Sequence, residues 1–306
     1  MAYIISASRR TDIPRFYAPW FAERRRAGWV EFRNAFGGLG RVSLSNEDVI
    51  GYLFWTRYAR PFTKALRDLL AEGVPCVFHF TINGYGREIE PHSPSLARAL
   101  ADFVALCAKL PAPQCIQWRY DPIVLSARYP IEYHLRRFRE IATALKGATQ
   151  VVNTSIVEPY LRTVRRVADP TVRYREFDPT QRPTVATLYP HLGQVGGDAQ
   201  PLLQGLTALA AESGMTLRLC SNPEYALPHA QCCSVEQFAP YGAAVVEQMT
   251  ALQPGPSRAG CRCLKTIDIG MDTTCPAGCE YCYAVHSRQA ALCNFRKHDP
   301  AAPRLR

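Results

Sequence analysis

The sequence predicts an α/β fold, a single TIM-like (β/α) barrel that spans residues 1–306 as one domain. Short apolar runs of strand length alternate with amphipathic segments of helix length along most of the chain. This alternation is typical of a mostly parallel sheet covered by helices. The chain has 306 residues, of which 47% are hydrophobic and 20% are charged, as expected of a globular protein with a substantial core.

The strands are predicted from apolar runs that end at polar or turn residues. In chain order they are expected at residues 3–8, 50–55, 76–82, 115–119, 150–155, 215–220 and 264–269. Two further segments, 30–34 and 41–44, flank Gly37 and Gly38 and are expected to form a hairpin. Seven parallel strands and an extra hairpin favour a closed or nearly closed barrel.

The helices are predicted from apolar residues that recur with the helical period. In chain order they are expected at residues 19–28, 62–71, 94–110, 131–145, 159–167, 201–213 and 234–249. Residues 170–196 are rich in Pro and Thr without a clear period, which predicts a lid or an inserted substrate loop. The polar, basic tail after Ala284 is expected to be poorly ordered.

The N-terminus predicts a cytoplasmic protein. Its apolar run is too short for a signal peptide, and its arginines follow that run instead of preceding it. No stretch approaches the roughly 18 apolar residues of a membrane span, so no membrane partner is expected. In that compartment 12 cysteines indicate metal binding more often than disulfides. Cys76, Cys107 and Cys115 stand singly in apolar runs and are expected to be inert buried thiols.

The formal net charge of +10 has two interpretations. Much of it comes from arginines in helical patterns, such as Arg24, Arg25 and Arg26, which would make solvated helix faces. The alternative is an anionic partner such as a nucleic acid or a nucleotide. No recognisable nucleic-acid-binding module accompanies the charge, so the first interpretation is preferred.

Polar residues follow nearly every predicted strand. In a (β/α) barrel the active site lies at the carboxyl ends of the strands, so these residues would surround one opening. Each of them could instead be a helix cap or turn residue, and Arg119 with Asp121 could be a plain ion pair. The candidates for ligand binding are Ser6, Arg9, Arg10, Asp12, Arg119, Asp121 and Asn153.

Three cysteines near the end of the chain form a C-x3-C-x2-C pattern: Cys275, Cys279 and Cys282. Three thiolates on one short loop suit an iron–sulfur cluster, whereas zinc requires four ligands and usually shows C-x2-C pairs. We therefore predict an iron–sulfur segment at residues 258–293. Three ligands leave the fourth iron of a [4Fe–4S] cluster open to bind a small molecule.

Five other cysteines lie between residues 220 and 263. A set of four thiolates would be complete with Cys220, Cys261, Cys263 and one of the adjacent Cys232 and Cys233, for which we select Cys233. Our hypothesis is a second, structural or electron-relaying cluster. The alternative is a group of thiols that lie close together by chance.

The pattern of Cys275, Cys279, Tyr281 and Cys282 resembles the signature of radical S-adenosylmethionine (SAM) enzymes. The resemblance implies that the open iron chelates SAM, that the reduced cluster splits it into a 5′-deoxyadenosyl radical, and that Tyr281 lies against the adenine. It also implies that the candidate polar residues bind SAM or substrate, and that an electron donor such as flavodoxin or ferredoxin reduces the cluster.

In that superfamily the triad follows the first barrel strand, whereas here it follows the last. The chain therefore resembles a circularly permuted radical SAM barrel, in which residues 6–12 occupy the strand end where the superfamily binds the SAM amino group. No Gly-Gly-Glu motif is present there.

The whole chain also resembles the bacterial domain-of-unknown-function family 1848, which names no substrate. The residues that carry this likeness are 6–14, 54–56, 119–122, 261–263, 267–270 and 275–284.

We accordingly expect a radical SAM-type enzyme with an unknown substrate. Two alternatives remain. One is a nucleic-acid-directed radical enzyme of the repair lyase type, which only the positive charge supports. The other is a non-catalytic protein in which an iron–sulfur or zinc site relays electrons or binds a partner.

Overall fold

The computed structural model describes residues 2–33, 37–158, 160–167, 171–172, 199–221, 225–255 and 260–306. Apart from Thr171 and Val172, the predicted lid at residues 170–196 lies outside the described residues.

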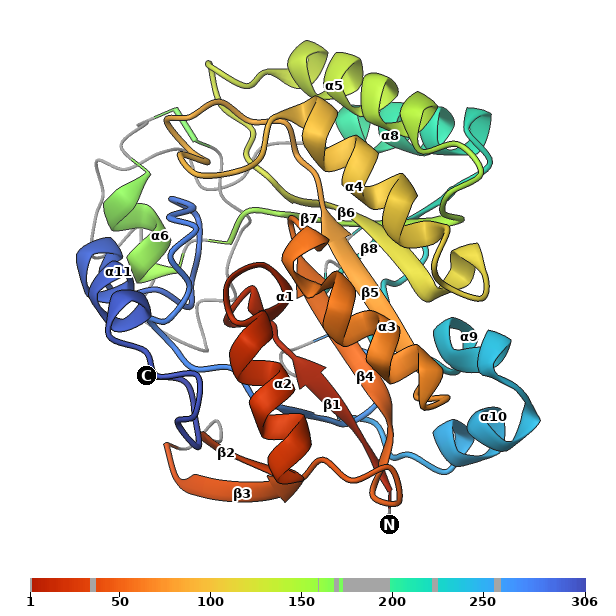
Figure 1. Cartoon of the computed structure of the whole chain (residues 1–306). Helices are drawn as coiled ribbons and strands as arrows, with labels where there is room; N and C mark the ends of the chain where they lie inside the picture. The colour runs from red at the N-terminus through yellow and green to blue at the C-terminus, as the bar shows by residue number, and fades with distance from the viewer. Residues whose placement is uncertain are drawn as a thin grey trace.

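A seven-stranded sheet organises the chain, in the order β8-β7-β6-β5-β4-β1-β9 (Figure 1). All neighbouring strands are parallel, which confirms the predicted α/β class. The strands are β1 Tyr3–Ala7, β4 Val49–Thr56, β5 Cys76–Thr81, β6 Ile116–Ile123, β7 Val151–Ile156, β8 Thr216–Leu219 and β9 Thr266–Asp268. The predicted hairpin is also present, as the antiparallel pair of β2 Trp29–Arg33 and β3 Leu39–Ser43.

The closed barrel is not shown, because the sheet is open between its edge strands β8 and β9. Irregular backbone lies between these two edges. Ala230 N–H donates to the Leu219 carbonyl of β8 at 3.0 Å, and Leu264 N–H, two residues before β9, donates to the Cys233 carbonyl at 3.0 Å. The edge strands have only four and three residues.

The described helices and 3-10 turns connect the strands. Several of them cover one face of the sheet (Figure 1), whereas the helix Val235–Phe238 lies against the other face, where Gln237 Nε2 is 3.3 Å from His79 Nε2. Aromatic contacts fix this layer: Phe103 packs against Phe80 at 5.3 Å between ring centroids, and Phe138 packs against Trp118 at 4.6 Å. The described helices and 3-10 turns are α1 Ile13–Phe16, α2 Ala18–Ala27, η1 Arg60–Phe62, α3 Thr63–Ala71, α4 Leu96–Cys107, η2 Pro113–Cys115, α5 Ile131–Ala144, α6 Leu161–Arg166, α8 Gln200–Glu212, α9 Val235–Phe238, η3 Ala239–Tyr241, α10 Ala243–Thr250 and α11 Arg288–Arg296.

Two local predictions were wrong. The single helix expected at 234–249 is divided into α9, η3 and α10, because Pro240 has no N–H to donate and Gly242 has a positive φ of 108°. The tail after Ala284 is ordered, since it forms α11 and then packs back on the chain. The Trp20 indole N–H donates to the Ala302 carbonyl at 2.9 Å, and Leu305 is fully buried.

The opposite face of the sheet is polar, and we call it the polar face. Side chains of parallel strands that share a register point to the same side, and Ser6 pairs with Asp268, Trp55 with His79, and Arg119 with Asn153. Its members are Ser6, Trp55, His79, Gln117, Arg119, Asp121, Asn153, Ser155 and Asp268. Within the described ranges, no helix has the length and apolar character needed to cross a bilayer.

Candidate metal and cofactor site

Asp268, the last residue of β9, gathers the loop that follows β1. Its Oδ2 accepts hydrogen bonds from Ser6 Oγ at 3.1 Å and from the backbone N–H of Arg9 at 2.9 Å. Its Oδ1 accepts from Ser8 Oγ at 2.8 Å and from Arg10 Nε at 3.3 Å. Three of the predicted ligand-binding residues, Ser6, Arg9 and Arg10, are therefore brought together by one carboxylate.

Gly270 allows this close approach of the two strand ends. A Cβ atom at position 270 would lie 2.6 Å from the Ser8 Cβ, closer than real carbon atoms approach. The Gly270 N–H also donates to Asp268 Oδ1 at 3.0 Å. Any side chain here would separate the β1 and β9 loops.

Arg119 and Asp121 form the ion pair that was considered as the alternative to ligand binding. Arg119 Nη2 lies 2.5 Å from Asp121 Oδ2, and Ser155 Oγ donates to the other carboxylate oxygen at 2.5 Å. Arg119 also reaches out of the pair: Nη1 donates to Cys232 Sγ at 3.3 Å, and the guanidinium lies 4.9 Å from the centre of the Trp55 ring. It thus connects the ion pair to the cysteines.

Asn153, on β7, is fully buried on the polar face. Its amide donates to Gln117 Oε1 at 2.6 Å, but its Oδ1 has no hydrogen-bond partner among the described residues, and neither has Nδ1 of the fully buried His79 on β5. Buried polar atoms in native proteins are nearly always hydrogen-bonded. The polar face therefore has unused hydrogen-bonding capacity for a polar ligand.

Asp12 has a different position from the other candidates. Its carboxylate caps α1 by accepting from Arg15 N at 3.1 Å, and it accepts from Arg57 N at 3.0 Å. Burial raises the pKa of Asp12, partly offset by Arg15 and by hydrogen bonds that include one from Thr56. The structure thus shows Asp12 as a link between the ends of β1 and β4.

The three triad cysteines lie on the loop between β9 and α11, and Cys279 is buried. Cys282 N–H donates to the Cys279 carbonyl at 3.2 Å, and Gly278 has a φ of +74°, which a glycine adopts readily. The pKa of Cys275 is raised to about 12 and that of Cys279 to about 11, mainly by burial, and the nearby Cys282 thiol contributes to both shifts. Cys282 is therefore within electrostatic reach of both other thiols.

Tyr281 does not present a free ring edge and hydroxyl to the triad. Its hydroxyl lies in a buried polar cluster, where it contacts Glu90 and Arg57 and accepts from Asn83 Nδ2 at 3.0 Å. Arg57 Nη1 in turn lies 2.9 Å from Glu90 Oε1. The ring meets Tyr85 edge-on at 6.3 Å. Tyr281 thus anchors the triad loop to the ends of β4 and β5.

The second cysteine group is a row of thiol contacts, Cys220–Cys232–Cys263–Cys261. The hydrogen bond with Cys220 lowers the pKa of Cys232. The hydrogen bond with Cys263 and burial raise it by more, so the net shift is upward. The pKa of Cys263 is lowered by its hydrogen bond with Cys232 and raised by its hydrogen bond with Cys261, with a net upward shift. The Cys232 N–H also donates to Cys263 Sγ at 3.1 Å. Cys232 is the member of the adjacent pair that contacts Cys220 and Cys263. Cys233 lies beside them, and burial raises its pKa to about 12.

Both cysteine groups fit an iron–sulfur cluster in donor chemistry, since each gathers soft thiols from one region. Within the described part of the chain, no three or more His, Cys, Asp or Glu side chains are arranged to hold a metal ion.

A family model with the description "Domain of unknown function (DUF1848)" matches residues 4–284. The chain belongs to the DUF1848 family. The match runs from β1 through the triad loop, so it includes the polar face and both cysteine groups, and it confirms the family resemblance seen in the sequence. Neither a curated protein nor a solved structure matches the chain. The likeness of this DUF1848 chain to radical SAM enzymes stays a prediction.

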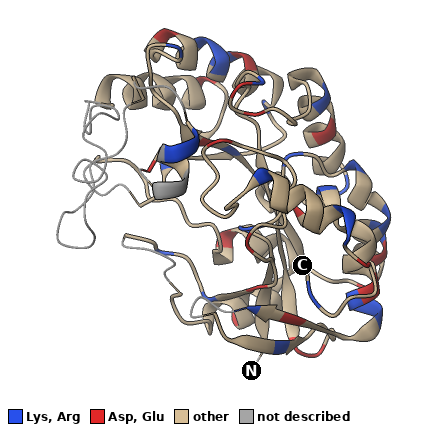
Figure 2. Cartoon of the chain, turned by 90° about the vertical axis from the view of Figure 1, so that its left-hand side faces the viewer, with Lys and Arg blue, Asp and Glu red and all other residues tan. Residues whose placement is uncertain are grey.

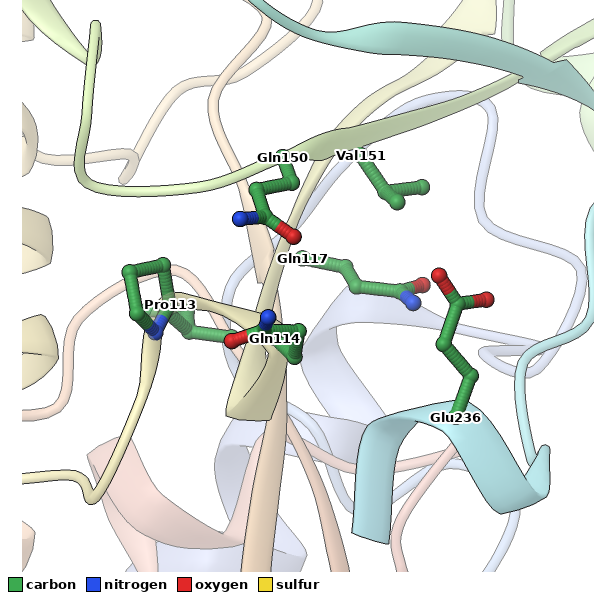
Figure 3. A pocket seen from close by; sticks show the side chains of 7 residues that line it. Pro113, Gln114, Gln117, Gln150, Val151 and Glu236 are labelled. Carbon is green, nitrogen blue, oxygen red and sulfur yellow. The ribbon is translucent and has the colours of Figure 1, made fainter. Parts of the chain in front are cut away.

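Two pockets of the DUF1848 chain differ in position. One is a narrow space at the start of β6 and β7 that does not admit a water molecule, lined by residues that include Gln117, Gln150 and Glu236 (Figure 3). It is at the amino ends of the strands. The other, of about 270 Å³, includes Arg15, Tyr58 and Arg98 and follows the carboxyl ends of β1, β4 and β5.

Two residues of the site have no counterpart among the sequence-derived candidates: Arg57 and Glu90. Arg57 directly follows β4, so the strand-end rule that selected the others also applies to it. Glu90 is on a loop without periodicity, and no sequence signal indicates its contact with Tyr281.

Proposed function

We propose that the chain is a radical SAM-type enzyme in which Cys275, Cys279 and Cys282 hold a [4Fe–4S] cluster with one open iron. The observation that carries this proposal is the place of the triad loop. It leaves the carboxyl end of β9, which pairs in parallel with β1 at the edge of the sheet. The strand order from β9 is then β1, β4, β5, β6, β7 and β8. This is the order of a barrel whose first strand has moved to the end of the chain.

When bound and reduced, such a cluster supplies the electron that splits the sulfonium of SAM into methionine and a 5′-deoxyadenosyl radical. The residues of this chain would position SAM and keep water away. Asp268 holds the backbone of residues 6–10 beside the triad loop, and Arg9 and Arg10 offer planar donors for a carboxylate. The unpaired Asn153 Oδ1 and His79 Nδ1 offer further contacts on the polar face. Burial of this face favours radical chemistry, because solvent is excluded.

The row Cys220–Cys232–Cys263–Cys261 supports a second cluster. Four thiols from three separate segments of sequence contact one another, and Arg119 donates to Cys232, which would stabilise a thiolate ligand. We propose that these four cysteines, with Cys232 or the adjacent Cys233 as one ligand, hold a structural or electron-relaying cluster.

Anaerobic reconstitution, reduction with dithionite and a search for 5′-deoxyadenosine test the first proposal. We expect the product from the wild type and none from Cys279→Ala. Cys293→Ala is the matched control, because Cys293 is an exposed thiol on the neighbouring α11. An intact cluster that yields no product and no spectral change with SAM would favour the non-catalytic alternative. A salt-sensitive shift with DNA or RNA would favour the nucleic-acid-directed alternative. Turnover with reduced flavodoxin or ferredoxin in place of dithionite would identify the electron donor.

Iron analysis tests the second cluster. Two [4Fe–4S] clusters give about eight irons per chain, and Cys263→Ala should lower this to about four while the triad retains its iron. A wild-type content of about four irons that Cys261→Ala and Cys263→Ala leave unchanged would remove the second cluster.

A further inference from the structure

The pocket of about 270 Å³ is lined by positive charge. Arg15 follows β1, Arg87 and Arg98 follow β5, and His92 lies between the latter two. The eight described residues that line the pocket include these three arginines and no Asp or Glu. Three guanidinium groups from separate segments around one concave space would repel one another without an anion between them.

The arginines are held in place and retain donors. Arg87 Nη1 donates to the carbonyls of Pro91 at 2.9 Å and Ser93 at 2.6 Å, which fixes its loop. Arg15 Nη2 donates to the His92 carbonyl at 2.5 Å, while its Nη1 is buried and has no acceptor among the described residues. A buried guanidinium nitrogen without an acceptor points to an anionic ligand that the protein itself does not supply.

The third arginine brings a hydroxyl to the same pocket. Arg98 Nη2 donates to Tyr58 Oη at 3.2 Å, and this hydrogen bond is the main cause that lowers the pKa of Tyr58. The Tyr58 O–H is thereby left to donate to a ligand oxygen.

The pocket borders the triad loop. The Cδ2 atom of His92 and a side-chain carbon of Pro91 lie 3.3 Å from where a Cβ of Gly278 would stand. Arg15 is near enough to lower the pKa of Cys279, although burial raises it overall. A molecule whose anionic end occupies this pocket would therefore have its remainder beside the triad.

We propose that this pocket binds the phosphate group of an organic phosphate and that this compound is the substrate. The role as substrate rests on the proposed radical SAM function, whereas the binding of phosphate does not. Guanidinium groups recognise phosphate oxygens with paired hydrogen bonds, and three of them match a dianion better than a single carboxylate charge. A pocket of this size takes one small group, unlike the extended track of a nucleic acid. Figure 2 shows acidic segments interspersed with the basic ones over the helices, instead of one basic face.

Calorimetric titration of the full chain with inorganic phosphate and with methyl phosphate tests the proposal. We expect saturable binding of both, weakened about tenfold or more by Arg87→Gln and by Arg98→Gln, each of which removes a charged donor. Arg98 is exposed, so its replacement leaves the fold intact, as thermal unfolding would verify. Arg26→Gln is the control, since Arg26 is exposed on α2 and pairs with Glu23; it should change the affinity by less than about twofold.

Absence of saturable phosphate binding, or equal loss in Arg26→Gln and Arg98→Gln, would overturn the proposal. Binding of a single-stranded oligonucleotide that methyl phosphate does not displace would overturn it in favour of a nucleic acid. The titration contains no SAM and no reductant, so its failure is separate from a failure to form 5′-deoxyadenosine. If the protein cleaves SAM but does not bind phosphate, the proposal of an organic phosphate as substrate is wrong and the radical SAM proposal is unaffected.

Discussion

Replacing Asp268 with Asn tests whether this carboxylate organises the site. Asn keeps the size of the side chain but replaces one acceptor oxygen by an NH2 group. If the NH2 takes the place of Oδ2, the Ser6 hydroxyl can rotate to accept a hydrogen bond from it. The backbone N–H of Arg9 can only donate, so it would lose its acceptor. A buried donor without a partner costs about 1–3 kcal/mol. The lost charge next to Arg9 and Arg10, whose side chains are 26% and 20% exposed, adds about 0.5–1 kcal/mol.

We therefore expect Asp268→Asn to lower the free energy of unfolding by about 1.5–4 kcal/mol. Equilibrium unfolding in urea measures this, and spectral titration of the reconstituted protein measures SAM binding, which should weaken as well. Asp272→Asn is the matched control, because Asp272 is 44% exposed and lies 3.7 Å from Arg10; its cost should stay below about 0.5 kcal/mol. The reasoning is refuted if the two variants have the same stability and the same affinity for SAM.

Three further predictions follow from single contacts. Gly270→Ala should lower the melting temperature clearly, because its Cβ would collide with Ser8; an unchanged melting temperature would show that the loop can yield. Tyr281→Phe should cost about 1–3 kcal/mol in urea unfolding, since Glu90 loses a buried donor; a neutral effect would show that the hydroxyl is dispensable. Burial lowers the pKa of His134 to about 4, so His134 is neutral when folded but protonated when unfolded below about pH 6.5. Stability should therefore fall by up to about 3 kcal/mol from this group as the pH drops from 6.5 to 4, and His134→Gln should lack that component; an equal pH slope in both proteins would contradict it.

The strands were predictable because their side chains alternate between two environments. In β5, Phe78 and Phe80 pack toward the helices, whereas His79 faces the polar side. Such runs are apolar enough to be recognised. Of the polar residues at their ends, Ser6, Arg9 and Arg10 meet at one carboxylate, whereas Asp12 links the ends of β1 and β4. The parallel pairing of β1 with β9 brings Ser6, Arg9 and Arg10 to Asp268. The order of the segments along the chain suggested this pairing.

Contacts between loops far apart in the chain could not be predicted from the sequence. Glu90 and Tyr281 are separated by 191 residues, and no periodicity relates them, so Tyr281 was expected to face a cofactor instead of a buried carboxylate. The open edge of the sheet depends on irregular backbone: the carbonyl of Cys233 and the N–H of Leu264 bond outside any strand. Which of Cys232 and Cys233 meets Cys263 is likewise decided by a single turn, not by spacing.

Arg9 relates the two cysteine groups physically. Burial lowers its pKa, but Asp268, Tyr283, Cys232 and Cys263 together raise it overall, so its positive charge lies between β9 and the second cysteine group. The hydroxyl of Tyr283, the residue after Cys282, donates to the Arg9 carbonyl at 3.3 Å. Thiolates that bind a metal carry negative charge, which the Arg9 guanidinium would stabilise in the second group, because Cys232 and Cys263 are within its electrostatic reach. If that group binds a cluster as proposed, its charge would act on Arg9, whose carbonyl accepts from the residue that follows Cys282.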